Sequence, residues 1–287
     1  MADADKPQAP DSVTESANPR TRDLDRLPLG ELVSRILDED ARVAGAVRAA
    51  RPALERACAV LVATLEAGGR WVNLGAGTSG RIGVLDAAEI PPTFGLEPDR
   101  VQSLVAGGPP ALVGAVEGAE DDVGAAVRDL RKAGLARGDA LVALSASGRT
   151  PYALSAVEHA RSVGARTIAI TCVPGSPLAE RAEIAIVAEV GPEVITGSTR
   201  MKGGLAEKMI LHTLSTAVMV KLGRVQGNLM TGLRAVNTKL QERGVRILCE
   251  LAGVSAQEAE RALDAAGGSV EKALENLTAQ DGKAARR

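Results

Sequence analysis

The sequence predicts an α/β fold, a three-layer sandwich with a mainly parallel sheet, followed by a small C-terminal helical appendage. Short apolar segments alternate with longer helical patterns between residues 71 and 222, which is typical of strand–helix repeats. Apolar and polar residues do not alternate within the short segments, so we expect strands that are buried on both faces. After Gly223 only helical patterns remain. A length of 287 residues, 45% of them hydrophobic, suffices for one large domain and a small one.

The N-terminal part precedes the first predicted strand. Residues 1–20 are rich in Ala, Pro, Asp and Ser, which predicts a flexible segment. Helical patterns follow over residues 27–48 and from Pro52 to residue 67. We expect these two helices to pack outside the sheet or against a partner subunit.

The central part contains the predicted sheet. The strands are predicted at residues 71–74, 101–105, 140–144, 166–171 and 184–188, and the helices at 80–89, 109–133, 151–163 and 202–222. Pro91 and Pro92 are expected to end the first of these helices. In the last one, Leu205, Met209, Leu214 and Val218 predict the core face.

The C-terminal part is predicted to form three short helices, over residues 234–250, 255–264 and 268–277. Ser255 and Ser269 are candidate N-caps. We therefore divide the chain into a flexible segment (1–20), an α/β domain with leading helices (21–228) and a three-helix appendage with its tail (229–287).

The composition argues against several classes of protein. A net charge of −2 does not favour a nucleic-acid surface. The chain opens without a signal-peptide pattern and has no apolar run of about 20 residues, so we expect no membrane span and a cytoplasmic protein. The three cysteines lie far apart and the two histidines are isolated, which predicts neither a disulfide framework nor a metal site. Aromatic residues make up only 1% of the chain, so recognition should rest on hydroxyl, amide and backbone groups.

The first candidate site is the loop from Gly75 to Gly80, between a strand and a helix. Such a loop directs backbone N–H groups and the positive end of a helix dipole at an anion. Thr78 and Ser79 add hydroxyl donors. The loop fits the G-x-G-x-x-G pattern, but a dinucleotide site also needs an acidic residue after the next strand. Ala106, Gly107 and Gly108 stand there instead, and a plain strand-to-helix turn remains the alternative.

The second candidate site follows the strand at residues 140–144. It places Ser145, Ser147 and Thr150 before Pro151, which favours the first position of a helix. Three hydroxyl groups and free N–H groups can hold a phosphate without a fixed positive charge. The alternative is a cluster of N-caps, although one hydroxyl would be enough for that role.

A third stretch, residues 191–202, contains Ser198 and Thr199 before a long helix. They fit helix caps and binding residues about equally. Of the nearby acidic residues, Glu89 stands at the far end of the helix after the first loop, and Glu120 belongs to a cluster with Glu117, Asp121 and Asp122. Most helical acids are solvated, and spacing alone singles out neither glutamate. The residues by themselves thus indicate an α/β domain that binds a phosphate or a phosphosugar.

Several long motifs resemble one family, the N-acetylmuramic acid 6-phosphate etherases, which belong with the sugar isomerase-domain and glucokinase regulatory protein-like proteins. These motifs are Gly-Ala-Gly-Thr-Ser-Gly-Arg-Ile-Gly-Val-Leu-Asp-Ala-Ala-Glu (75–89), Ala-Val-Glu-Gly-Ala-Glu-Asp (115–121), Ala-Ser-Gly-Arg-Thr-Pro-Tyr (146–152) and Thr-Gly-Ser-Thr-Arg-Met-Lys (196–202). Asn228-Leu229-Met230, followed by Asn237 and Lys239, also fits. The similarity runs from about residue 14 to about residue 277.

The resemblance implies a homodimer with a sugar isomerase-type domain that cleaves the D-lactyl ether of N-acetylmuramic acid 6-phosphate. The products would be N-acetylglucosamine 6-phosphate and D-lactate, without a metal or an organic cofactor. By similarity, Glu89 is the catalytic acid and Glu120 the second active-site glutamate. Ser79, Ser147 and Thr150 would bind the 6-phosphate.

The expected binding set is completed by the other hydroxyl side chains of these loops, which are Thr78, Ser145, Ser198 and Thr199. Two alternatives remain, a non-catalytic regulator that senses a phosphosugar and a sugar-phosphate isomerase. A regulator would not need both glutamates, and an isomerase would release no lactate.

Overall fold

The computed structural model describes residues 12–284, and their side chains up to residue 279. The chain separates into two compact units. The first contains residues 12–86 and 101–214, and the second contains residues 87–100 and 215–284.

The first unit is built on a five-stranded sheet in which neighbouring strands run parallel. Its order is β2 (Val101–Val105), β1 (Trp71–Gly75), β3 (Ala140–Leu144), β4 (Arg166–Thr171) and β5 (Ile184–Val187). All five predicted strands are confirmed within one residue at each end. Every residue of β1 and β3 is buried, as the non-alternating apolar pattern predicts.

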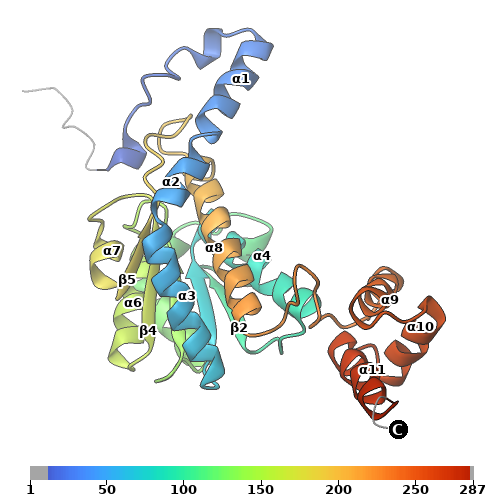
Figure 1. Ribbon diagram of the computed structural model, residues 1–287. Coiled ribbons are helices and arrows are strands. Elements are labelled where there is room, and N and C mark those ends of the chain that lie inside the picture. The colour runs from blue at the N-terminus through green and yellow to red at the C-terminus, as the bar shows by residue number, and fades with distance from the viewer. Residues whose placement is uncertain (1–11, 285–287) are drawn as a thin grey trace, which may run out of the picture. The chain divides into compact units, whose positions relative to one another are not determined.

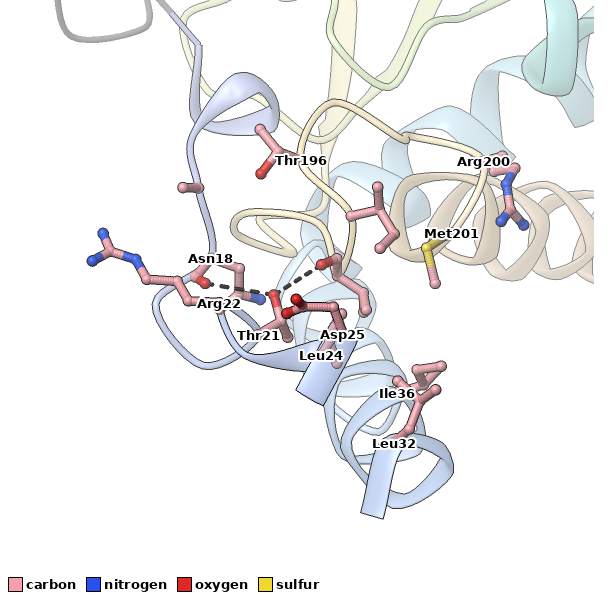
Figure 2. A pocket seen from close by; sticks show the side chains of 13 residues that line it. Asn18, Thr21, Arg22, Leu24, Asp25, Leu32, Ile36, Thr196, Arg200 and Met201 are labelled. Atoms are coloured by element: carbon pink, nitrogen blue, oxygen red, sulfur yellow. Dashed lines mark hydrogen bonds between the residues drawn. The ribbon is translucent and has the colours of Figure 1, made fainter. Parts of the chain in front are cut away.

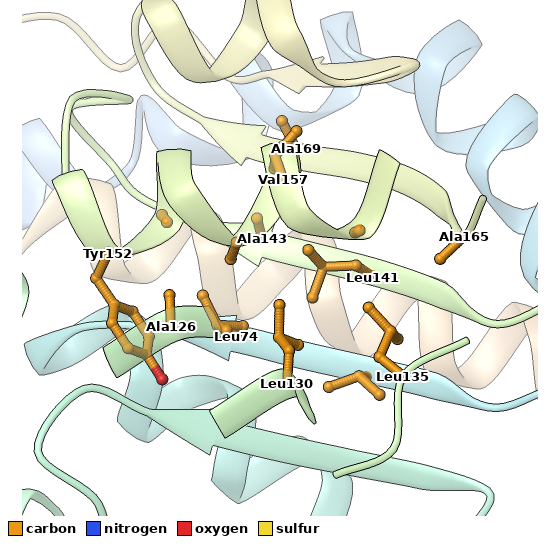
Figure 3. Close-up of a cluster of buried hydrophobic side chains, with 14 of the residues drawn as sticks. Leu74, Ala126, Leu130, Leu135, Leu141, Ala143, Tyr152, Val157, Ala165 and Ala169 are labelled. Atoms are coloured by element: carbon orange, nitrogen blue, oxygen red, sulfur yellow. The ribbon is translucent and has the colours of Figure 1, made fainter. Parts of the chain in front are cut away.

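Helices cover both faces of this sheet (Figure 1). On one face, α3 (Arg51–Glu66) packs against β1, β3 and β5. On the other face lie α5 (Val123–Lys132), α6 (Pro151–Ser162) and α7 (Pro177–Arg181). Figure 3 shows the core beneath this second layer, where Leu74 and Leu141 meet Leu130 and Val157. The predicted three-layer α/β sandwich is therefore confirmed.

Two of the helices predicted after β1 differ from those of the structure. The helix after β1, α4, extends over Gly77–Phe94 and includes Pro91 and Pro92, because the fixed φ of proline is compatible with a helix. The helix predicted over residues 109–133 is wrong for its first half. Two short 3-10 turns, η3 (Pro109–Leu112) and η4 (Ala119–Asp121), precede α5 there. Gly118 adopts a φ of 71° just before η4, which interrupts a right-handed helix.

The N-terminal region contains η1 (Val13–Glu15), η2 (Leu24–Arg26), α1 (Leu29–Asp40) and α2 (Val43–Ala49). The single helix predicted over residues 27–48 is thus two helices. Of the segment predicted to be flexible, residues 1–11 lie outside the described residues. In the rest of it, Asn18 is buried and donates hydrogen bonds to Glu39 Oε2, at 2.8 Å, and to the carbonyl of Pro192.

The second unit has its own small core, formed by α9 (Thr238–Ala252), α10 (Ala256–Ala265) and α11 (Val270–Ala284). The hydroxyls of Ser255 and Ser269 accept hydrogen bonds from the N–H groups of Glu258 and Lys272, which confirms both predicted caps. Across the described part of the chain, every helix is too short or too polar to traverse a lipid bilayer.

Candidate functional site

The sheet has a topological switch point between β1 and β3. The chain proceeds from β1 to β2 on one side, whereas β4 and β5 are added beyond β3 on the other. The loops that leave β1 and β3 therefore open at the same edge, which is the usual ligand-binding position in open α/β sheets. These are the two hydroxyl-rich loops identified in the sequence, after Gly75 and after Leu144.

The loop after β1 makes a tight turn into α4. A Cβ on Gly80 would lie 2.5 Å from the carbonyl oxygen of Gly75, so a side chain cannot be accommodated there. Gly77 has a φ of 53°, a conformation that favours glycine. The turn leaves Thr78 half-buried and Ser79 buried at the start of α4. Ser79 Oγ lies within hydrogen-bond distance, 2.8 Å, of Oε1 of Glu207, a residue of α8 (Lys202–Lys221).

The loop after β3 brings its three hydroxyl groups together. Ser145 Oγ lies 2.9 Å from Thr150 Oγ1 and 3.4 Å from Ser147 Oγ. The N–H groups of Gly148 and Arg149 donate to the hydroxyls of Ser145 and Ser147, respectively. Thr150 is the N-cap residue of α6 by position, yet its side chain accepts no hydrogen bond from that helix. The Thr150 hydroxyl is thus a member of the cluster and not a helix cap.

The third stretch brings the start of α8 against both loops. A Cβ on Gly203 would lie 2.9 Å from the Cβ of Ala146, and one on Gly204 would lie 3.0 Å from Cγ2 of Thr78. These two glycines therefore allow α8 to approach the loops closely. Ser198 and Thr199 precede the helix and are half-buried.

The cap of α8 corrects our interpretation of Ser198 and Thr199. The buried carboxylate of Glu193 accepts hydrogen bonds from the N–H groups of Lys202, at 2.9 Å, and Gly203, at 2.8 Å. Glu193 therefore satisfies the first two donors of the helix, in place of the two predicted hydroxyls. Burial raises the pKa of Glu193, although these hydrogen bonds oppose the rise.

Two arginines, Arg81 and Arg149, lie beside or in the hydroxyl loops. Arg81, next to the first loop, donates to the carbonyls of Ala111, at 2.9 Å, and Gly114, at 2.8 Å, and so holds the segment around η3. Arg149, in the second loop, is exposed. The hydroxyl and backbone N–H groups of the two loops provide donors at this edge, and the exposed Arg149 belongs to the second loop. Among residues 12–279, no group of three or more His, Cys, Asp or Glu side chains is arranged to hold a metal ion.

The two candidate glutamates fall in different compact units. Glu120 is exposed on η4 in the first unit, and η4 packs against α6, the helix that begins after the second hydroxyl loop. Glu89 is exposed on α4 in the second unit, ten positions after Ser79 along the same helix. The structure thus brings Thr78, Ser79 and the three hydroxyls of the second loop to one edge of the sheet, and the roles of Glu89 and Glu120 remain predictions.

Sequence reasoning missed Glu207 and Glu193, both of them buried beside this edge. A glutamate within the mostly apolar pattern of residues 205–219 was the available signal for Glu207. For Glu193 the signal was weaker, because a carboxylate nine positions before a helix does not by itself indicate a cap.

A separate cavity of about 740 Å³ lies between the N-terminal segment, α1 and the loop before α8 (Figure 2). Leu32 and Ile36 of α1 and Met201 provide apolar walls, and Arg22 and Asp25 provide charges. Thr21 fixes one wall by donating a hydrogen bond of 2.8 Å to the carbonyl of Val194. None of the predicted phosphate-binding hydroxyls lines this cavity.

Comparison with known proteins identifies the domain and the family. Residues 53–161 match the glucokinase regulatory protein N-terminal SIS domain, and residues 122–217 match the SIS domain. Among solved structures, a putative phosphosugar isomerase involved in capsule formation from Bacteroides fragilis has a TM-score of 0.52 at 22% identity, over 70% of this chain and 95% of that one. Phosphoheptose isomerase from Neisseria gonorrhoeae also has a TM-score of 0.52, at 20% identity over 67% of this chain and 98% of that one. These two structures share the fold of this chain, and the two family matches assign that fold to the SIS domain.

Much closer relatives exist among curated proteins. N-acetylmuramic acid 6-phosphate etherase from Erwinia tasmaniensis is 50% identical over 272 residues, which is 93% of this chain and 89% of the relative. The etherase from Yersinia pestis is 51% identical over 251 residues, 88% of this chain and 85% of the relative. The resemblance inferred from the sequence motifs is confirmed, and the chain belongs to the N-acetylmuramic acid 6-phosphate etherase family.

Proposed function

We propose that this protein is a carbon–oxygen lyase that cleaves the D-lactyl ether of N-acetylmuramic acid 6-phosphate. The products are N-acetylglucosamine 6-phosphate and D-lactate. The observation that carries the proposal is the 50% identity to a curated etherase over 93% of this chain. The hydroxyl loops at the switch point of the sheet support it, because they provide the donors that a sugar phosphate requires.

The phosphate is held at the start of α4 and α6. Ser79, Ser147 and Thr150 donate to its oxygens, and Thr78 and Ser145 complete the hydroxyl set. The free N–H groups and dipoles of the two helices add a positive field without a charged side chain. Ser198 and Thr199 would contribute hydroxyl groups alone, because Glu193 already occupies the first N–H groups of α8.

The chemistry requires one acid and one base. In the open-chain sugar, the C1 aldehyde acidifies the proton on C2, and the lactyl ether on C3 is a leaving group. Removal of the C2 proton forms a C2–C3 double bond as the C3–O bond breaks, and the departing lactate oxygen takes up a proton. Water then adds its oxygen to C3 while C2 is protonated again.

We assign the two proton transfers to the glutamates, in opposite protonation states. Glu89 protonates the departing lactate, and Glu120 transfers the proton at C2 or the proton of the attacking water. Neither step needs a metal or an organic cofactor to balance.

An isotope experiment tests this route. In H₂¹⁸O, elimination followed by water addition places ¹⁸O on C3 of N-acetylglucosamine 6-phosphate and leaves D-lactate unlabelled. In D₂O, the same route places deuterium on C2. If the label instead enters lactate, the bond broken is the one on the lactyl side of the ether, and the elimination is contradicted.

The assembly and location belong to the same proposal. We propose that the protein is a cytoplasmic homodimer and that α1 contributes to the interface. Leu29, Val33 and Leu37 recur every four residues along this helix and are 76%, 47% and 61% exposed. An apolar stripe of this kind on one helix face is typical of a contact surface. Its partner would be a second copy of the chain.

A further inference from the structure

Directly behind the first hydroxyl loop lies a carboxyl group that the proposed reaction does not use. Glu207 is only 1% exposed, and its Oε1 lies 2.8 Å from Ser79 Oγ. Its second oxygen, Oε2, is also buried and accepts no hydrogen bond from any of the described residues. No Lys or Arg side chain among residues 12–279 forms an ion pair with it. An ionised carboxylate in this position would therefore be buried without a counter-charge.

The protonation of Glu207 decides what Ser79 can do. A serine hydroxyl has a single hydrogen to donate. If Glu207 is ionised, it can only accept, and the hydrogen of Ser79 points toward the carboxylate. If Glu207 is neutral, its own O–H can donate to Ser79 Oγ over the same distance, and the hydrogen of Ser79 is released for another acceptor.

We propose that Glu207 acts as a neutral carboxylic acid that donates to Ser79 Oγ and so directs the Ser79 hydroxyl toward the phosphate of the substrate. Glu207 is in this account a positioning residue and not a catalytic one. The inference rests on the proposed function, since it assumes that Ser79 binds a phosphosugar. The ionised form would bind poorly for two reasons, the loss of the Ser79 donor and the repulsion between the Glu207 carboxylate and the phosphate.

The surroundings favour the neutral acid. Burial raises the pKa of Glu207 to about 8, against a smaller opposing effect of the Ser79 hydrogen bond. Cys172, directly after β4, is also buried, and burial raises the pKa of its thiol. The charges that act on this thiol are those of Glu207, Glu193 and Lys202. Glu193 is engaged with the start of α8, and Lys202 is paired with Glu39. The buried Glu207, which has no ion-pair partner among the described residues, is thus a group beside Ser79 whose charge changes on the alkaline side of neutrality.

The test measures the Kd of N-acetylglucosamine 6-phosphate between pH 7 and pH 9.5. A phosphate monoester loses its second proton near pH 6, so the ligand keeps its charge over this range. If only the neutral acid binds, the Kd of the wild type rises by up to about 30-fold at 1.5 pH units above the pKa of Glu207. Glu207→Gln cannot ionise, and its amide still donates to Ser79. We expect its Kd to change by less than about twofold over the same range.

A control and a second measurement make the outcome decisive. Lys208→Gln changes the next position of α8 and should keep the wild-type pH profile. Calorimetry of the wild type in buffers of different ionisation enthalpy should detect uptake of nearly one proton per site at pH 9 and almost none at pH 7. This readout does not depend on the folding of a variant.

The possible failures are distinguishable. A flat profile for the wild type, an equal alkaline loss in Glu207→Gln, or binding at pH 9 without proton uptake would overturn the role of Glu207 while the proposed function stands. Absence of binding by the wild type at every pH would overturn the phosphosugar site, and this inference with it.

Discussion

The ammonium group of Lys202 donates a hydrogen bond of 2.8 Å to Oε2 of Glu39, and both side chains are almost completely buried. Lys202 Nζ also donates to the carbonyl of Val190, and Asn18 and Arg20 donate to the same carboxylate. The cluster thereby connects the N-terminal segment and α1 to the start of α8, which packs against both hydroxyl loops.

Removal of one partner from this pair should destabilise the fold strongly. Glu39→Gln leaves Lys202 buried without its ion-pair partner, and we expect a loss of about 3–5 kcal/mol in the free energy of unfolding. Glu183→Gln is the matched control, because it breaks a half-exposed pair with Arg166 and should cost no more than about 1 kcal/mol. Denaturant titration of both variants checks the difference. Equal losses would contradict the role of the buried pair.

The same cluster predicts a loss of stability in acid. Hydrogen bonds from Arg20, followed by those from Lys202 and Asn18, hold the pKa of Glu39 well below its usual range despite burial. A carboxyl group whose pKa is lower in the folded state stabilises the fold above its unfolded pKa, near 4.5, and this contribution disappears as the pH falls through the lower folded value. The wild type should therefore lose more stability than Glu39→Gln when Tm is compared between pH 6 and pH 3. Parallel Tm curves would count against this account.

The hydroxyl loop after β3 should determine affinity more than turnover. Ser147→Ala and Thr150→Val each remove one donor, so the Kd of N-acetylglucosamine 6-phosphate should rise about fivefold to tenfold. Ser162→Ala removes an exposed hydroxyl at the far end of α6 and serves as the control. Calorimetric titration of the three variants provides the comparison. If Ser147→Ala and Thr150→Val bind as tightly as the control, the phosphate is held elsewhere.

The two glutamates should control turnover and not affinity. Glu89→Gln and Glu120→Gln each retain the shape of the side chain but cannot transfer a proton, so kcat should fall by about 100-fold or more. Glu117→Gln, three positions before Glu120 and likewise exposed, should keep its activity. Product formation at saturating substrate gives kcat, and a binding titration shows whether the site is intact. Near-full activity in either variant would remove that glutamate from the mechanism.

The apolar stripe of α1 should be needed for dimerisation. Leu37→Glu introduces a charge into the proposed interface, and we expect sedimentation velocity to show a shift from dimer toward monomer. Glu31→Ala changes the opposite side of α1 and should remain dimeric. A wild-type monomer, or a Leu37→Glu dimer as stable as the wild type, would show that α1 is not part of the interface.

Much of the fold was predictable because its strands are short and apolar between clear breaks. All five were placed correctly, whereas several helix boundaries differ from the predicted ones. Pro91 and Pro92 did not end α4, since a helix tolerates the φ of proline even where it loses a hydrogen bond. The residues from Pro109 to Gly118 look helical by composition, but backbone breaks divide them into turns.

The site was only partly predictable, since buried polar contacts come from residues far apart in sequence. The hydroxyls of both loops could be named because each follows a strand directly. Helix α8 is apolar on most sides, which weakens its periodicity, and Leu205 is exposed although we predicted it on the core face. Glu207 is buried instead, 128 positions from the Ser79 that it contacts. No local pattern reveals such a pair.

The central claim is tested most directly by incubating the purified protein with N-acetylmuramic acid 6-phosphate, in EDTA and without any added cofactor, and measuring D-lactate. The account predicts one D-lactate for each N-acetylglucosamine 6-phosphate formed. Tight binding of the phosphosugar without lactate would contradict it in favour of a sensor. An isomerised sugar phosphate without lactate would contradict it in favour of an isomerase.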